Sequence, residues 1–241
     1  MAEIGLGYGS EYQLLRYLGH HRIELNDIIK NNTKLDGELI WLDFPKDLKA
    51  LSLDGEYAGL DFLNDNIVKG LIPPLDIIKL LSNWKGYWSS TGRQPNWDGV
   101  ILHKKDDQFE LVIVEAKAHL KEIESKTKSN SNQDIQNAFQ DTQNNFGICN
   151  GNWFGKYYQL ANRLAFVNFL HNNGIEASLL YIYFINGYEK RQLNGKQKIT
   201  VEDKCVPDEV AWNNVIADEY IDLGINAKAK QYISKIFINC K

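Results

Sequence analysis

The sequence from Asn96 to Lys117, NWDGVILHKKDDQFELVIVEAK, contains two apolar runs separated by a short polar segment. Residues 97–103 and 109–117 are rich in the β-branched and aliphatic side chains that β-strands favour. Residues 104–108 between them are polar and few enough to form a hairpin turn. This stretch therefore predicts an antiparallel β-hairpin.

The expected register of the hairpin brings three reactive side chains together. If Asp106 and Asp107 form the turn, Asp98 lies opposite Glu115, with about 4.5–5.5 Å between their Cβ atoms. Side chains alternate along a strand, so Glu115 and Lys117 point to the same face. This register assumes a ladder without a bulge, because a bulge would shift every partner. We expect Asp98, Glu115 and Lys117 to converge on one small region.

Two carboxylates side by side repel each other unless a counter-charge neutralises them. Mg²⁺ prefers oxygen ligands and typically uses one or two carboxylates together with water and substrate phosphate. The alternative interpretation is an exposed strand end in which Lys117 is an ion-pair partner, and the short Glu-x-Lys pattern alone favours it. The apolar run that ends at Glu115 and the turn just before Asp98 favour a metal site.

The remaining sequence predicts an α/β chain. Ser10 is a candidate N-cap for a first helix, and Gly19 is expected to end that helix. Further helices are expected over residues 23–31, 75–81, 133–145, 208–220 and 228–237, with a strongly amphipathic one over 153–172. Strands are expected over residues 84–89 and 177–185, the latter apolar on both faces. A strand, a helix and a strand in this order imply a parallel crossover, and we expect a single domain over residues 1–241.

The composition limits the function classes. The chain is 44% hydrophobic, which suits a globular protein, and its net charge of −4 counts against a strongly basic nucleic-acid binder without excluding nucleic acid. The three cysteines match neither a disulfide framework nor a zinc site. The start of the sequence lacks the pattern of a signal peptide, and its apolar runs are too short to span a bilayer. These features favour a cytoplasmic protein that does not act at a membrane.

Residues 96–99 (NWDG) and 112–119 (VIVEAKAH) resemble the core of the PD-(D/E)xK, or restriction-endonuclease-like, nuclease superfamily, in particular bacterial members with Trp-Asp and Glu-Ala-Lys-Ala-His. The resemblance covers residues 95–122 and implies a central mixed sheet flanked by helices. It implies Asp98, Glu115 and the Ala116 carbonyl as ligands of Mg²⁺, for which Mn²⁺ could substitute. Lys117 is the implied catalytic lysine. Trp97 stands where the family motif has proline.

Three further residues have supporting roles in this interpretation. Members of the superfamily often place an acid from an N-terminal helix near the metal, and Glu11 suits that role; the alternative is an acid favoured by the helix dipole. Gln159 and Arg163 lie four residues apart on one helical stripe. In related nucleases a polar residue on the corresponding helix contacts the site or the phosphate, and a solvated helix face is the alternative.

The resemblance implies a metal-dependent nuclease that hydrolyses phosphodiester bonds, with DNA as the expected substrate. The sequence is also compatible with a homodimer. The first alternative is a catalytically silent module that keeps the nuclease fold for binding or assembly, which the acidic net charge favours. The second is a hydrolase of a small phosphate compound, because the same metal site could serve a narrower pocket.

Overall fold

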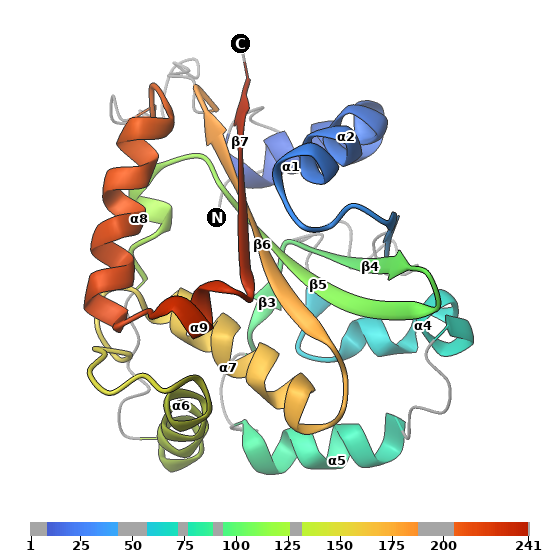
Figure 1. Ribbon diagram of the computed structural model, residues 1–241, viewed down its shortest axis with the longest axis vertical. Helices are drawn as coiled ribbons and strands as arrows, with labels where there is room; N and C mark the ends of the chain where they lie inside the picture. Colours follow the sequence, from blue (N-terminus) through green and yellow to red (C-terminus); the bar gives the residue numbers. More distant parts are fainter. Residues whose placement is uncertain are drawn as a thin grey trace, which may run out of the picture.

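The computed structural model describes residues 9–42, 57–71, 77–88, 94–125, 132–187 and 205–240. Its centre is a five-stranded mixed sheet with the order β1-β4-β5-β6-β7 (Figure 1). The strands of this sheet are β1 (Glu38–Trp41), β4 (Gly99–Lys105), β5 (Gln108–Lys117), β6 (Ala177–Ile185) and β7 (Ile233–Asn239). The first three pair antiparallel and the last three pair parallel. A small second sheet pairs β2 (Tyr57–Ala58) with β3 (Asn96–Trp97).

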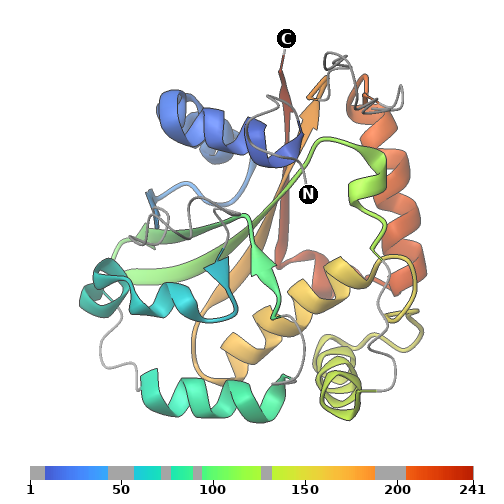
Figure 2. The same cartoon turned by 180° about the vertical axis from the view of Figure 1, so that it is seen from behind.

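Helices flank this sheet, as Figures 1 and 2 show from opposite sides. The helical elements are α1 (Ser10–His20), α2 (Arg22–Asn32), η2 (Asp61–Asn64), α4 (Asn66–Leu71), α5 (Ile77–Tyr87), η3 (Leu120–Glu122), α6 (Gln133–Phe146), α7 (Tyr158–Asn172), α8 (Glu209–Leu223) and α9 (Ala227–Lys230). The expected mixed α/β class with a helix-flanked mixed sheet is therefore confirmed.

The alternation of side chains along β5 divides the apolar interior into two clusters. Val112, Val114 and Ala116 belong to the cluster that α1 and α2 cover. Leu111 and Ile113 belong to the larger cluster that contains the buried side chains of α5 to α8. Because Glu115 and Lys117 share the parity of Ile113, their side chains lie on the α7 and α8 side of the sheet.

The predicted hairpin register is confirmed, since the ladder runs from Gly99 opposite Val114 to Lys105 opposite Gln108. The prediction of one continuous strand over residues 97–103 is wrong. The chain leaves the sheet at Asp98, and Trp97 belongs to β3 in the small second sheet. Trp97 is fully buried, donates from Nε1 to the Gly59 carbonyl at 2.7 Å and packs on Phe166 with ring centroids 4.3 Å apart. These contacts hold Trp97 away from the path of β4.

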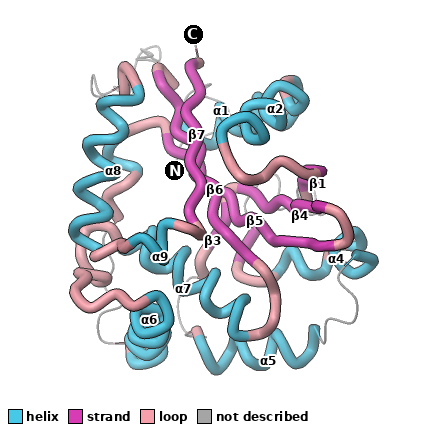
Figure 3. Tube along the Cα trace, viewed as in Figure 1, coloured by secondary structure: helices cyan, strands magenta, loops and turns pink. Residues whose placement is uncertain are grey.

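The segment after the hairpin follows the predicted strand–helix–strand order. All nine residues of β6 are buried, and β6 pairs parallel to β5 as expected. The helix over residues 153–172 begins later than predicted, at Tyr158 in α7. It is also not amphipathic, because every residue from Leu160 to Leu170 is buried. Figure 3 shows the reason, since α7 runs between the sheet and the helices α5 and α6.

Three other predictions need correction. Residues 84–87 are helical rather than extended and form the end of α5. Trp84 stacks there on Trp88, which follows the helix, with ring centroids 5.7 Å apart. The expected helix over residues 228–237 is instead the short α9 followed by β7. The first helix continues one residue past Gly19, and its N-cap is Gly9 rather than Ser10, which is its first helical residue. Residues 75, 76 and 89, at the edges of two predicted elements, lie outside the described residues.

Within the described ranges, no helix combines the length and the apolar character needed to cross a membrane.

Candidate active site

Asp98 directly precedes β4, beside the carboxyl-terminal part of β5. Its carboxylate oxygen Oδ2 accepts a hydrogen bond from the backbone N–H of Ala116 at 2.7 Å. The β4 ladder stops at Gly99, so the side chain of Asp98 supplies the acceptor that a longer β4 would have given. The N–H and C=O of one strand residue point to the same neighbouring strand. The carbonyl oxygen of Ala116 therefore faces the same edge as the Asp98 carboxylate.

Glu115 is almost completely buried, with 3% of its surface exposed. Its Oε1 accepts hydrogen bonds from the Lys117 ammonium and from Gln159 Nε2, the latter at 2.8 Å. Its Oε2 accepts from Arg163 Nε at 2.9 Å and Nη2 at 2.7 Å. Burial opposes ionisation of Glu115, but the charges of Arg163 and Lys117 outweigh it and lower the pKa below its usual value. Glu115 is therefore an ionised carboxylate with both oxygens engaged by the protein.

Arg163 connects Glu115 to the backbone next to Asp98. Its Nη2 also donates to the Asn96 carbonyl at 2.6 Å, and its Nη1 donates to Asn162 Oδ1 at 2.6 Å. The guanidinium lies over the ring of Trp97, 4.9 Å from the centroid, in a cation–π arrangement. The face of the Trp97 ring therefore helps to hold the Arg163 guanidinium in place.

Lys117 is also buried, with 5% of its surface exposed. Burial lowers the pKa of a lysine, but the nearby carboxylates of Glu115, Asp98 and Glu122 outweigh it and raise the pKa of Lys117. Lys117 is therefore an ammonium at neutral pH. Its chemistry is to stabilise negative charge, and it is a poor candidate for a general base.

Glu122, the last residue of η3, is a further acid near Lys117. Its Oε2 accepts from the backbone N–H groups of Ala118 at 2.6 Å and His119 at 3.1 Å, which fixes the turn after β5. His119 accepts from the Lys121 N–H at 3.1 Å through Nδ1, so its ring forms a cap of η3. Ser10 Oγ donates to Glu122 Oε1 at 3.2 Å and brings the start of α1 to this end of β5.

Glu11 lies in the first turn of α1, next to Ser10, whose hydroxyl bonds to Glu122. Helix α1 packs through Leu14 and Tyr17 onto the face of the sheet opposite to Glu115. The side chains that donate to Glu115 are Lys117, Gln159 and Arg163 rather than residues of α1. The metal-binding role of Glu11 stays a prediction that the geometry gives no added support.

Most of the other predicted residues do meet. Asp98, Glu115 and Lys117 converge at the end of β5, and both Gln159 and Arg163 of α7 hydrogen-bond to Glu115. The solvated-face alternative for the α7 pair is wrong for Arg163, which is buried.

Sequence reasoning missed Glu219 of α8, a buried acid whose electrostatic neighbours include Lys117 and Glu115. Its signal was present, because Trp212, Ile216, Glu219 and Leu223 repeat at helical spacing and are all buried.

A divalent cation can be tested against this donor set. No group of three or more His, Cys, Asp or Glu side chains in the described parts of the chain is arranged to hold a metal ion. The set that the sequence implies is different, since it comprises the carboxylates of Asp98 and Glu115 and the carbonyl of Ala116. These are hard oxygen ligands of the kind that Mg²⁺ prefers. They fit the ion chemically, on the condition that Lys117 leaves Oε1 of Glu115.

Comparisons of the chain with known protein families, with curated proteins and with solved structures found no match. The function is therefore inferred from the residues of the site.

Proposed function

We propose that this chain is a Mg²⁺-dependent nuclease with a restriction-endonuclease-like fold, and that it hydrolyses phosphodiester bonds in DNA. The observation that carries the proposal is the meeting of Asp98, Glu115 and Lys117 at the end of β5, where β4 breaks. A mixed sheet with helices on both faces supports it, because this is the architecture that the sequence resemblance implies.

The chain's own residues divide the work in this proposal. Asp98, Glu115 and the Ala116 carbonyl would hold Mg²⁺, which when bound supplies a Lewis acid and a water of lowered pKa. Lys117, held protonated by its acidic neighbours, stabilises negative charge on the phosphate. Arg163 and Gln159 orient Glu115 through its two oxygens. Asp98 is placed by its hydrogen bond from Ala116.

A second function has one observation in its favour. Both oxygens of Glu115 already have protein donors, and only 3% of the residue's surface is exposed. A silent binding module would keep such a network as a buried, charge-compensated part of the fold. The two functions differ in whether Glu115 is released to a metal ion.

Cleavage assays with paired variants test the nuclease. Asp98→Asn keeps an oxygen that can accept the Ala116 N–H, and Lys117→Met keeps the side-chain length while removing the charge. Each should lower Mg²⁺-dependent cleavage of DNA by roughly 10²-fold or more, the usual loss when a group that stabilises transition-state charge is removed. Lys105→Met is the control, because Lys105 is exposed near the hairpin turn and pairs with Asp36. The control should cleave like the wild type.

The assay should include single-stranded DNA, duplex DNA and RNA, each with Mg²⁺ and with Mn²⁺. Cleavage of RNA alone would correct the substrate. Wild-type protein that cleaves none of them, while its variants fold normally, would favour the silent module. Full activity in both Asp98→Asn and Lys117→Met would refute the proposed mechanism.

A further inference from the structure

Helix α8 carries a buried acid that the roles above do not use. Glu219 is 3% exposed and lies on the same helical stripe as Trp212 and Ile216. Within the described residues, its Oε2 has no hydrogen-bond partner, and the same holds for the hydroxyl of Tyr181 on β6. Buried polar atoms nearly always have a partner, and an unsatisfied one costs about 1–3 kcal/mol. Such a cost calls for a functional explanation.

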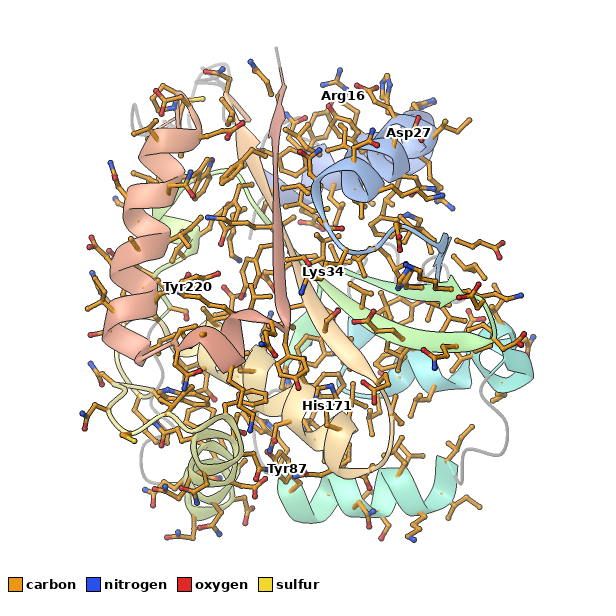
Figure 4. All side chains as sticks on the ribbon, viewed as in Figure 1. Arg16, Asp27, Lys34, Tyr87, His171 and Tyr220 are labelled. Atoms are coloured by element: carbon orange, nitrogen blue, oxygen red, sulfur yellow. The ribbon has the colours of Figure 1, made fainter. Side chains whose placement is uncertain are left out.

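The titratable groups that interact electrostatically with Glu219 come from β5, β6 and α8. Tyr181 lies opposite Glu115 in the ladder and Tyr183 lies opposite Lys117, so both rings share the face of the site residues. Arg163 of α7 interacts electrostatically with Tyr181, and Tyr220, labelled in Figure 4, follows Glu219 on α8. Burial, the largest influence, raises the pKa of Glu219 to about 8, while Lys117 favours its ionised form and Glu115 opposes it.

Metal binding at Glu115 creates a problem for Lys117. A cation at Oε1 of Glu115 would displace the ammonium that this oxygen now accepts. Lys117 is 95% buried, as its 5% exposure shows, and leaving a buried charge without a partner is strongly unfavourable. Of the other acids near Lys117, Asp98 would itself be a metal ligand. Both oxygens of Glu122 already accept hydrogen bonds from Ser10 and from the turn after β5. Lys117 therefore needs a further acceptor within the protein before Glu115 can serve as a ligand.

We propose that Glu219 is a positioning residue that accepts Lys117 when Glu115 turns to a divalent cation. It has the properties such a residue needs, namely an oxygen that no donor in the described residues occupies, near-complete burial and electrostatic coupling to Lys117. The exchange would keep the ammonium beside the site, on the α8 side of β5. This inference rests on the proposed metal-dependent function and adds a residue from the C-terminal part of the chain to it.

The test is calorimetric titration of the full chain with Mg²⁺ and with Mn²⁺, comparing the wild type with Glu219→Gln. Glu219 is protonated at neutral pH and would release its proton to solvent as it accepts Lys117. Gln matches the size of the protonated Glu but has no proton to release and cannot become an anion for Lys117. The dissociation constant should rise about tenfold, as expected for the loss of one charge-assisted hydrogen bond. Asp218→Asn is the matched control, because Asp218 is the exposed neighbour on α8 and its removal changes the net charge equally. The control should bind like the wild type.

Thermal unfolding of each variant separates positioning from structure. The inference predicts that Glu219→Gln weakens metal binding while its unfolding temperature stays at or above that of the wild type. Glu219→Met removes both oxygens and gives a second reading if the Gln variant folds poorly. Unchanged affinity in a folded Glu219 variant would overturn the inference and leave the proposed nuclease intact. A wild type that binds neither ion would overturn the proposed function and this inference with it.

Discussion

Glu115 shows at the scale of a single residue how a charge is kept inside this protein. An isolated buried carboxylate would take up a proton, yet Glu115 has four donated hydrogen bonds from Lys117, Gln159 and Arg163. Glu219 is buried to the same extent, but its Oε2 has no hydrogen-bond donor in the described part of the chain, and its pKa is raised rather than lowered. The two acids therefore differ in charge at neutral pH because of their partners and not because of their depth.

This difference predicts an opposite pH dependence for Glu219. Its pKa rises from 4.5 to about 8 on folding, so the folded chain binds more protons than the unfolded chain between these values. The contribution of Glu219 to the stability of the wild type should therefore decrease as the pH rises from about 4.5 to about 8. Glu219→Gln has no proton to lose. Across this pH range, the free energy of unfolding of the variant should therefore increase relative to that of the wild type, by an amount on the order of a few kcal/mol.

Urea unfolding at pH 5, pH 7 and pH 9 would measure this gain. The free energy of unfolding of the variant, minus that of the wild type, should increase from the first pH to the last. A difference that stays constant with pH would show that Glu219 has an ordinary pKa. Asp218→Asn, at the exposed neighbouring position of α8, is the matched control.

At the scale of secondary-structure elements, two helix ends offer a matched comparison. Gly224 follows α8 with φ of 67°, and Gly174 follows α7 with φ of 76°, so both use the left-handed region that glycine favours. A Cβ added at Gly224 would lie 2.1 Å from the Asn150 carbonyl oxygen, whereas one at Gly174 would meet nothing within 4 Å. We expect Gly174→Ala to lower the free energy of unfolding by about 1 kcal/mol, because alanine disfavours this backbone conformation. Gly224→Ala should lower it clearly more, because the added Cβ also clashes with the Asn150 carbonyl.

Urea unfolding of the two alanine variants at one pH would test this order. Equal losses, or a larger loss for Gly174→Ala, would show that the contact of Gly224 with Asn150 is not what constrains the end of α8.

The same scale shows what the sequence could predict. Strands β4, β5 and β6 were predictable because long β-branched runs flank a turn or fill a fully apolar segment. Residues 84–87 were mistaken for a strand because the segment is rich in aromatic residues, although Trp84 and Trp88 are spaced as neighbours on a helix. The helix expected over residues 228–237 extended α9 too far, because α9 is rich in alanine and lysine, which favour helix, while β7 presents only two buried positions, Ile236 and Ile238.

At the scale of the whole molecule, the site joins segments that are far apart in the sequence. Asp98, Glu115 and Lys117 lie in one hairpin, so local register was enough to place them together. Arg163 and Gln159 needed the crossover that lays α7 against the sheet. Glu219 needed the position of α8, which no local pattern specifies. The break at Asp98 also depended on tertiary structure, because burial of Trp97 against Phe166 overrides its preference to continue the strand.

The central claim is that Glu115 exchanges its hydrogen bond from Lys117 for a metal ion shared with Asp98. A crystal structure of the chain grown with Mn²⁺ tests it most directly, because the anomalous signal of the ion locates it without reference to activity. The claim predicts one Mn²⁺ bound by the carboxylates of Asp98 and Glu115 and the carbonyl of Ala116, with Lys117 turned away from Glu115. Saturating Mn²⁺ with no ion between these residues, and Lys117 still bonded to Glu115, would contradict it.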